Sequence, residues 1–199
     1  MKISNAKFAG SSTSVQRRSG VRLPEFAFIG RSNVGKSSLI NMLCNNGKLA
    51  MTSSTPGKTK VVNHFLINDS WYLVDLPGYG YAKLGAKARA ELIGVIRDYI
   101  LNSEDMVLLF VLVDSRYDIV STDLDFMAEL GENSIPFNII LTKCDKIGPN
   151  VLAAQIERDR EILARDWDEI PPILCSSSHT GAGREDILDC IDKVLKNNI

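Results

Sequence analysis

Apolar residues along the chain fall into short runs, separated by longer segments in which apolar positions recur at helical spacing. The short runs predict six β-strands, at Phe26–Ile29, Val61–Ile67, Trp71–Leu76, Met106–Val113, Phe137–Leu141 and Ile173–Cys175. The periodic segments predict five helices, at Lys36–Asn45, Ala86–Leu101, Ser121–Leu130, Pro149–Ala164 and Arg184–Lys196. Strands that alternate with helices in this way indicate an α/β fold.

Two features predict how the strands are arranged. Met106–Val113 is apolar without a break, as is typical of a parallel strand covered on both faces. Asn68, Asp69 and Ser70 separate two strand-like runs, so we expect a hairpin there. The pattern therefore predicts three layers: a mostly parallel six-stranded sheet with one antiparallel edge strand, and helices on both faces. Such sheets bind ligands beyond the carboxyl ends of their strands.

The chain has 199 residues, of which 45% are apolar and 24% charged, as is ordinary for one globular domain. Residues 1–24 are polar and rich in serine, and we expect them to form a basic arm before a single domain over residues 25–199. No apolar run approaches the roughly 20 residues of a membrane span, and the N-terminus lacks the apolar stretch of a signal peptide. We therefore expect a cytoplasmic protein with no membrane partner.

Charge is distributed unevenly, although the net charge is only −1. Residues 1–60 contain ten Lys and Arg but a single acid, Glu25, which gives them +9 and leaves −10 for the rest. This asymmetry favours an anionic partner, such as a nucleotide or RNA, and equally fits two parts of the chain that attract each other on folding. The cations are Lys2, Lys7, Arg17, Arg18, Arg22, Arg31, Lys36, Lys48, Lys58 and Lys60.

Cysteine and histidine spacing argues against zinc and against a disulfide framework. The chain has Cys44, Cys144, Cys175 and Cys190, together with His64 and His179. None of the cysteines is at C-x-x-C spacing, and the histidines lie far apart in the sequence. We expect reduced, mostly buried cysteines.

A phosphate-loop pattern, G-x-x-x-x-G-K-S, lies between the first predicted strand and the first predicted helix. It comprises Gly30, Arg31, Ser32, Asn33, Val34, Gly35, Lys36 and Ser37, and is followed by Ser38. The glycines let backbone N–H groups wrap around phosphates, and the helix N-terminus adds its positive dipole end. We expect Lys36 to contact the β- and γ-phosphates and Ser37 to give its hydroxyl to Mg²⁺.

A second motif, Asp75-Leu76-Pro77-Gly78, ends the predicted strand Trp71–Leu76. Asp75 is expected to hold Mg²⁺ through water, as the acidic partner of the phosphate loop. The N–H of Gly78 is within reach of a γ-phosphate and would sense its presence. By itself D-x-x-G is a weak signal, but its place after a phosphate loop and a hairpin strengthens it.

A third motif, Thr142-Lys143-Cys144-Asp145, predicts the choice of base. Guanine presents two adjacent donors, N1–H and the 2-amino group, and an ionised carboxylate accepts from both. Adenine has no such pair, so Asp145 is expected to select guanine, with the aliphatic stem of Lys143 along the base plane. The alternative is an ordinary solvated loop, which the order of the motifs disfavours.

Two further loops complete the predicted site. Ser176–Ser178 follow the last strand and offer backbone N–H groups to guanine O6, with Ser177 and Ser178 as the favoured pair. Residues 50–60 are polar and turn-rich. One of Thr52, Thr55 and Thr59 is expected to close on Mg²⁺ and the γ-phosphate, and the residue pattern alone does not choose among the three.

The order of these motifs resembles that of the small GTPases related to translation factors, which share the P-loop NTPase fold. Within them the strings PEFAFIGRSNVGKSSLIN, STPGKTK, LVDLPGYGYAK and LVDSR resemble the EngB (YsxC/YihA) family of bacterial ribosome-assembly GTPases, over about residues 6–195. Ser178 stands where related GTPases often have alanine. The resemblance implies a monomeric switch that acts in assembly of the large ribosomal subunit, with rRNA and ribosomal proteins as partners, and is needed for normal growth and cell division.

The same resemblance assigns the metal-binding threonine of T-P-G-x-T to Thr59. It adds Thr55, Pro56, Gly57 and Lys58 to the expected nucleotide contacts. Lys36, Thr59 and Gly78 then form the expected catalytic set, and Ser37, Thr59 and Asp75 the expected Mg²⁺ set.

Two residues bear on the rate of hydrolysis. Tyr79 follows D-x-x-G, where signalling GTPases have the glutamine that orients the attacking water, so intrinsic hydrolysis should be slow. In similar GTPases an asparagine at the position of Asn33 helps to hold K⁺, and the alternative is a tolerated loop residue. The rival function, a nucleotide kinase or an ATPase unrelated to ribosomes, would need an arginine-rich lid and a base pocket without Asp145.

Overall fold

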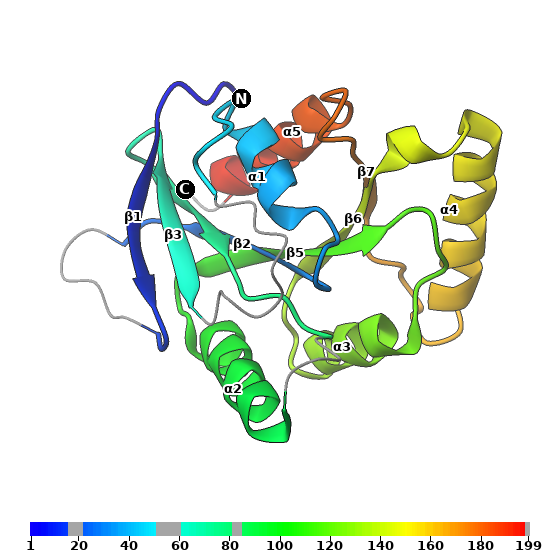
Figure 1. Ribbon diagram of the computed structural model, residues 1–199, viewed down its shortest axis with the longest axis horizontal. Helices are drawn as coiled ribbons and strands as arrows, with labels where there is room; N and C mark the ends of the chain where they lie inside the picture. The colour runs from blue at the N-terminus through cyan, green and yellow to red at the C-terminus, as the bar shows by residue number, and fades with distance from the viewer. Residues whose placement is uncertain (16–21, 51–60, 81–84, 198–199) are drawn as a thin grey trace.

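A seven-stranded sheet covered by helices on both faces forms the centre of the computed structural model, which describes residues 1–15, 22–50, 61–80 and 85–197 (Figure 1). The strands are β1 (Ala6–Ser12), β2 (Glu25–Gly30), β3 (Val62–Ile67), β4 (Trp71–Asp75), β5 (Met106–Asp114), β6 (Phe137–Thr142) and β7 (Ile173–Cys175), in the order β1-β3-β4-β2-β5-β6-β7. The helices are α1 (Lys36–Leu43), α2 (Ala86–Asn102), α3 (Ser121–Glu132), α4 (Pro149–Leu163) and α5 (Arg184–Asn197), with a short 3₁₀ turn η1 (Cys144–Lys146).

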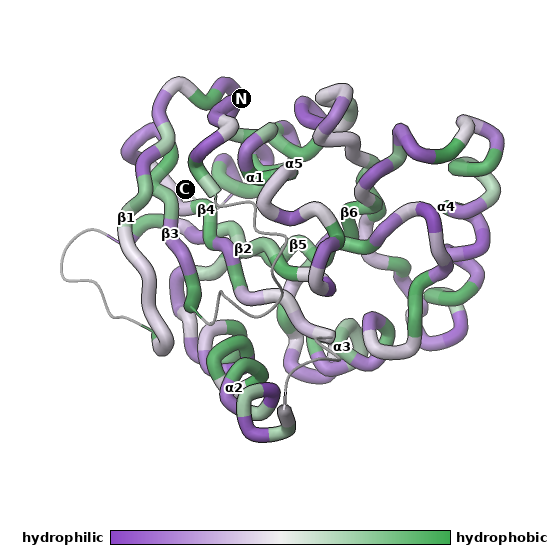
Figure 2. Tube along the Cα trace, viewed as in Figure 1, coloured by the Kyte–Doolittle hydropathy of each residue, from purple (hydrophilic) through white to green (hydrophobic). Residues whose placement is uncertain are grey.

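Alternating side chains of the central strands build two separate cores. On β2, Phe26 and Phe28 pack with α1 and α5, whereas Ala27 and Ile29 pack with α2, α3 and α4. The strand β5 is divided in the same way, and its middle is buried on both sides, which explains its unbroken apolar sequence. Figure 2 shows these strands as the hydrophobic centre between more polar helices. The predicted three-layer α/β class is therefore confirmed.

The sheet has one strand more than the sequence pattern predicts. Residues 6–12, expected within a separate arm, form β1 and pair antiparallel with β3. This places β3, the strand expected at the edge, inside the sheet between β1 and β4. Most of β1 is exposed and its register shifts between Phe8 and Gly10, so it carries no alternating apolar pattern that would reveal it.

The predicted hairpin holds the N-terminal segment in place. Asn68 and Asp69 have φ angles of 50° and 52°, as the two central residues of a type I′ turn require. The Asn68 side chain accepts hydrogen bonds from the N–H groups of Ser4 and Asn5, at 2.9 and 3.1 Å, and donates to the carbonyl of Lys2 at 2.8 Å. One turn residue thus fixes both the hairpin and the chain that enters β1.

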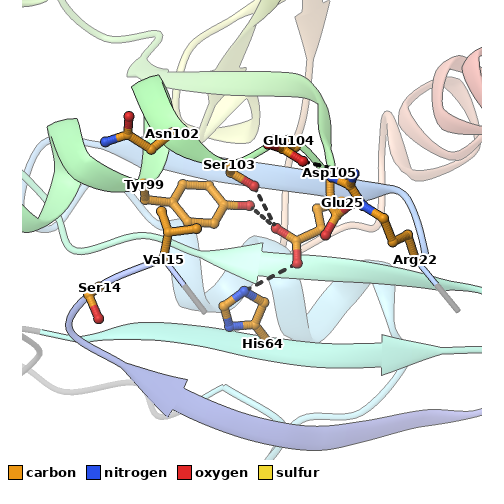
Figure 3. A pocket seen from close by; sticks show the side chains of 10 residues that line it. All are labelled: Ser14, Val15, Arg22, Glu25, His64, Tyr99, Asn102, Ser103, Glu104 and Asp105. Atoms are coloured by element: carbon orange, nitrogen blue, oxygen red, sulfur yellow. Dashed lines mark hydrogen bonds and ion pairs between the residues drawn. The ribbon is translucent and has the colours of Figure 1, made fainter. Parts of the chain in front are cut away.

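At the amino end of β2, opposite the carboxyl ends of the parallel strands, a cavity of about 270 Å³ surrounds a polar cluster (Figure 3). Glu25 is 5% exposed and accepts a hydrogen bond of 2.5 Å from Tyr99 Oη. His64 Nε2 lies 3.4 Å from its other oxygen. Glu25, the single acid of residues 1–60, is therefore buried. Tyr99 and His64 give its carboxylate the polar partners that a buried charge needs.

In the parts of the chain that the structure describes, none of the helices has the length and apolarity that a bilayer crossing needs. The four cysteines are free, and Cys44 is buried. Cys144, Cys175 and Cys190 are partly buried.

Candidate guanine-nucleotide site

The phosphate loop joins β2 to α1 at the carboxyl edge of the sheet. Gly35 has a φ of 106° and immediately precedes the first residue of α1, so a side chain there would be strained. A Cβ on Gly30 would lie 2.8 Å from the carbonyl oxygen of Leu112 on β5. Both glycines of the pattern are therefore required, one by backbone conformation and the other by close packing.

The structure brings Lys36 of the first motif onto Asp75 of the second. The Lys36 ammonium forms an ion pair with Asp75 Oδ1, and the side chains are 13% and 8% exposed. Ser37 lies in the same first turn of α1, and Asp75 ends β4. The expected phosphate-binding cation and the expected metal-binding carboxylate thus occupy one spot at the helix N-terminus.

Backbone hydrogen bonds fasten the D-x-x-G segment to the phosphate loop. Tyr79 N donates to the carbonyl of Gly30, and Ser32 N donates to the carbonyl of Tyr79, each at 3.2 Å. Leu76 N donates to the carbonyl of Phe28 at 3.0 Å. Leu76, Pro77 and Gly78 are therefore held alongside the phosphate loop.

Thr142 and Lys143 connect the third motif to the first. Thr142 Oγ1 donates to the carbonyl of Val34 at 2.7 Å. Lys143 Nζ donates to the carbonyl of Asn33 at 2.8 Å and to Asp114 Oδ2 at 2.8 Å. Because the ammonium is anchored at both points, the aliphatic stem of Lys143 is held beside the phosphate loop, with its Cε 3.7 Å from the position of a Cβ on Gly35.

Asp145 and Ser177, from different motifs, share a hydrogen bond. Ser177 Oγ donates to Asp145 Oδ1 at 2.7 Å, and Lys146 Nζ lies 3.1 Å from Oδ2. The Ser177 hydrogen bond, helped by Lys146, lowers the pKa of Asp145 against the opposing effect of desolvation. The carboxylate therefore stays ionised and acceptor-only near neutral pH.

The backbone of the serine loop is partly committed to the fold. Ser176 N donates to the carbonyl of Leu141 at 2.7 Å, and Ser177 N donates to that of Ala182 at 3.0 Å. A Cβ on Gly183 would lie 1.8 Å from the carbonyl oxygen of Cys175, so this glycine lets the loop fold back on itself. The backbone N–H groups of Ser176 and Ser177 are thus engaged within the fold, and the expectation that Ser177 and Ser178 contact the base stays a prediction.

Part of the predicted set lies outside the described residues. This holds for Thr52, Thr55, Pro56, Gly57, Lys58 and Thr59. Within the described residues, all three strand-end motifs and the serine loop meet at one edge of the sheet.

Comparison with known proteins identifies what shares this architecture. The family described as "50S ribosome-binding GTPase" matches residues 25–143. The "Probable GTP-binding protein EngB" of Bacteroides thetaiotaomicron is 54% identical over 196 residues, which cover 98% of this chain and 97% of that protein. The chain belongs to the EngB family. It is therefore a GTP-binding protein and a GTPase.

Other relatives agree with this assignment. The protein of the same name from Porphyromonas gingivalis is 52% identical over 194 residues, covering 98% of this chain and 96% of its own. A crystal structure of a probable GTP-binding protein EngB superposes with a TM-score of 0.64 at 25% identity, over 87% of this chain and 99% of that one. Aquifex aeolicus Era bound to GDP·AlF₄⁻ shares the fold, with a TM-score of 0.69 at 22% identity over 87% of this chain and 57% of Era.

Asp114 and Arg116, to which sequence reasoning assigned no role, line a pocket together with the phosphate loop and Lys143. Asp114 ends β5 and accepts a two-point interaction from Arg116, with Nε at 2.9 Å and Nη2 at 2.8 Å, besides Lys143 Nζ. The string LVDSR, noted only for its family resemblance, was the available signal. Desolvation acts to raise the pKa of Asp114, but the hydrogen bonds of Arg116 and Lys143 outweigh it and lower the pKa to about 2.

Asp114 should make folding of this EngB-family protein acid-sensitive. Its folded-state pKa of about 2 lies below the unfolded value of 3.8, so its stabilisation is present above about pH 4 and lost as pH falls from about 4 to 2. After allowance for solvent screening this amounts to about 1–2 kcal/mol. Urea unfolding of Asp114→Asn at pH 5, 4 and 3 should show a shallower acid loss than the parent, and parallel curves would contradict the assignment.

The side chain of Tyr79 contacts α3. Its hydroxyl donates to Asp123 Oδ1 at 2.9 Å, and its ring centroid lies 4.9 Å from that of Phe126. Burial and the neighbouring Asp123 raise the pKa of Tyr79, so the phenol remains a donor. The expectation that Tyr79 does not orient the attacking water stays a prediction.

Tyr79→Phe should therefore affect stability more than chemistry. It leaves Asp123, which is 3% exposed, without the phenol donor, at a cost of about 1–3 kcal/mol in the free energy of unfolding. Urea denaturation measures this cost, and single-turnover hydrolysis should change less than about three-fold, since the ring still packs on Phe126. Asp123→Asn, which keeps an acceptor, is the matched control, and an unchanged unfolding midpoint in Tyr79→Phe would refute the role.

Proposed function

We propose that this chain is a nucleotide-controlled switch that hydrolyses GTP slowly and binds the large ribosomal subunit or its precursor. The nucleotide-binding part of this proposal rests on segments that are distant in sequence but meet at one edge of the sheet. The contacts are Lys36–Asp75, Thr142–Val34, Lys143–Asn33 and Ser177–Asp145. Such a partner would place the protein in the cytoplasm, with effects on growth and cell division.

Each part of the nucleotide has a candidate set of residues. Residues 30–38 and the N-terminus of α1 would hold the phosphates. The Asp145 carboxylate would accept from N1–H and the 2-amino group of guanine, and the N–H of Ser178 would donate to O6. The stem of Lys143 would lie along the base plane.

Mg²⁺ fits the residues at the phosphate end. The hard cation prefers oxygen ligands, and the Ser37 hydroxyl and the buried Asp75 carboxylate supply them beside the phosphate loop. In this proposal Ser37 and Thr59 would bind the ion directly, and Asp75 would hold it through water. When bound, Mg²⁺ neutralises charge on the β- and γ-phosphate oxygens. Lys36 adds a fixed positive charge there.

The switch consists of two loops, residues 50–60 and 77–85. Thr59 and the N–H of Gly78 would contact the γ-phosphate, so that both segments order around GTP and relax after hydrolysis. The backbone bonds of Tyr79 to Gly30 and Ser32 support this coupling, because they join the D-x-x-G segment to the phosphate loop.

A potassium ion beside Asn33 would supply the charge that an arginine finger provides elsewhere. Asn33 is exposed in the phosphate loop at a φ of 65°, while its carbonyl is held by Lys143. Phosphate release in matched K⁺ and Na⁺ buffers should be faster in K⁺, and Asn33→Ala should abolish the difference. Equal rates in the two buffers for the parent would leave Asn33 as an ordinary loop residue.

The ribosomal part of the proposal rests on the family description and on the basic residues of the N-terminal segment. Two of the arm cations are not free for RNA as the sequence suggested: Lys7 lies 3.6 Å from Asp69, and Arg22 bridges Glu104 and Asp105 at 2.8 and 2.6 Å. Arg17 and Arg18, which lie outside the described residues, remain the candidates for phosphate contacts.

Co-sedimentation with large ribosomal subunits tests this part. Binding with a non-hydrolysable GTP analogue should exceed binding with GDP and should fall steeply with salt. Arg17→Glu/Arg18→Glu should weaken it without changing GTP affinity. The matched control is Arg160→Glu/Arg165→Glu, an equal charge change on exposed residues at and after the end of α4. Equal pelleting in all nucleotide states would overturn the proposal.

The rival function, a kinase or ATPase, makes a different prediction for the base. ATP should then displace a fluorescent GTP analogue as well as GTP does. The ionised Asp145 carboxylate opposes this outcome, since adenine has no adjacent donor pair for it.

A further inference from the structure

The carboxylate of Asp114, at the end of β5, is held by four donors, and one of them belongs to the base motif. Its Oδ1 accepts from the backbone N–H and Nε of Arg116, at 3.2 and 2.9 Å. Its Oδ2 accepts from Arg116 Nη2 and from Lys143 Nζ, each at 2.8 Å. A carboxylate has about four acceptor positions, so these donors fill them. The arrangement leaves Asp114 no position for a metal ion and suits it to hold Lys143 in place.

The ammonium of Lys143 depends on Asp114 more than on its other partner. That partner is the carbonyl of Asn33 in the phosphate loop, at 2.8 Å. A neutral carbonyl is a weaker acceptor than a carboxylate. The Lys143 side chain is 27% exposed, and a lysine with that access to water has much rotamer freedom to lose. The bond to Asp114 therefore does most to keep the Lys143 stem in one conformation.

The backbone of Lys143 is restrained as well. Its φ is 59°, in the left-handed region that residues other than glycine rarely adopt. The preceding residue, Thr142, is the register partner of Asp114, and its carbonyl accepts from Ser115 N at 3.0 Å. A strained conformation of this kind persists where the surrounding contacts determine it. Both the backbone and the side chain of Lys143 are thus fixed against the end of β5.

We propose that Asp114 is a positioning residue for guanine-nucleotide binding, which holds the Lys143 stem ready for the base and so slows nucleotide release. This inference rests on the proposed place of the stem along the base plane. Because the stem is ordered before the nucleotide arrives, binding carries no further cost for ordering it. The effect should be equal for GDP and GTP, which share the base. It should leave the preference for guanine over xanthine unchanged, since that choice belongs to Asp145 in the proposed site.

The experiment measures the release of fluorescent GDP, and of a fluorescent non-hydrolysable GTP analogue, into excess unlabelled GDP. Asp114→Ala should release both about ten-fold faster than the parent. Asp114→Asn keeps an acceptor for Lys143 and should accelerate release by about three-fold or less. Glu129→Ala is the matched control, because it likewise removes a carboxylate held by an arginine at two points, here Arg97 at 2.6 and 2.9 Å. It should release both nucleotides as the parent does.

A double-mutant cycle tests whether Asp114 acts through Lys143. Lys143→Met keeps an apolar stem but loses the ammonium, so it should also release nucleotide about ten-fold faster. Asp114→Ala/Lys143→Met should be no faster than the faster single variant, whereas independent effects would multiply to about a hundred-fold. Urea unfolding is measured on each variant. A role in stability alone would lower the unfolding midpoint of Asp114→Ala without changing release, and would overturn the inference.

The outcomes separate this inference from the proposed function. Parent-like release from Asp114→Ala with fast release from Lys143→Met would refute the role of Asp114 alone, as would effects that multiply in the double variant. Parent-like release from Lys143→Met would show that its ammonium does not position the base, and the proposed role of Lys143 would fail together with the inference. If Asp114→Ala does not fold, Arg116→Ala makes the test by removing two donors from Asp114. Its release should be about three-fold faster, and an unchanged rate would overturn the inference.

Discussion

Asp145→Asn is expected to transfer the preference of the protein from guanine to xanthine nucleotides. Ser177 donates to one Asp145 oxygen, so the oxygen of the new amide will face Ser177 and its NH₂ group will take the other position. That NH₂ opposes a donor of guanine, whereas xanthine presents a carbonyl at the same place. The loss for GTP should be about 2–4 kcal/mol, or roughly 30- to 1000-fold in Kd.

Competition of a fluorescent nucleotide by GTP and by XTP measures the change in preference. Asp168→Asn, at an exposed acid remote from the motifs, should behave as the parent does. An Asp145→Asn protein that binds GTP as tightly as the parent would show that another residue selects the base.

Lys36→Ala is expected to impair both nucleotide binding and folding. Loss of a charged hydrogen-bond donor to the phosphates should weaken GTP binding by about 3 kcal/mol, roughly a hundred-fold. The motif alone suggests that Lys36 serves only the ligand, but the structure also pairs it with the buried Asp75. Removal of one partner of a buried ion pair costs about 3–5 kcal/mol, so unfolding should occur at markedly lower urea concentration.

A second substitution separates the two effects. Lys36→Ala/Asp75→Asn removes the unpaired carboxylate and should recover most of the stability but none of the affinity. Ser37→Ala, in the same turn of α1, should lose Mg²⁺-dependent affinity while keeping the stability of the parent. Equal stability of Lys36→Ala and the parent would mean that the ion pair with Asp75 is not part of the folded state in solution.

Much of the fold follows from local periodicity. Runs such as Met106–Val113 and the hairpin at Asn68–Ser70 carry their own signals, because a strand buried on both faces must be apolar and a type I′ turn needs residues that accept positive φ. The predicted strands and helices match the observed ones closely. The phosphate loop could be predicted equally well, because the backbone N–H groups expected to bind phosphate are consecutive and Gly30 and Gly35 shape the loop.

The edge strand β1 shows where local signals fail. Most of its residues are exposed, and its strand conformation comes from pairing with β3, fifty or more residues away in sequence. Because of this pairing, residues 6–12 of the expected arm belong to the sheet. Local composition cannot reveal a strand that is defined by its partner rather than by its own burial.

The sequence by itself determined the fold class, the family, and the order of the nucleotide motifs, because each depends on residues that are contiguous along the chain. Only the tertiary structure decided the contact of Tyr79 with Asp123, the hydrogen bond from Lys143 to Asp114, and the Lys36–Asp75 ion pair. Each of these joins side chains that lie far apart in the sequence. Their meeting depends on the order and register of the strands, which pack the parallel sheet so that distant residues share one edge.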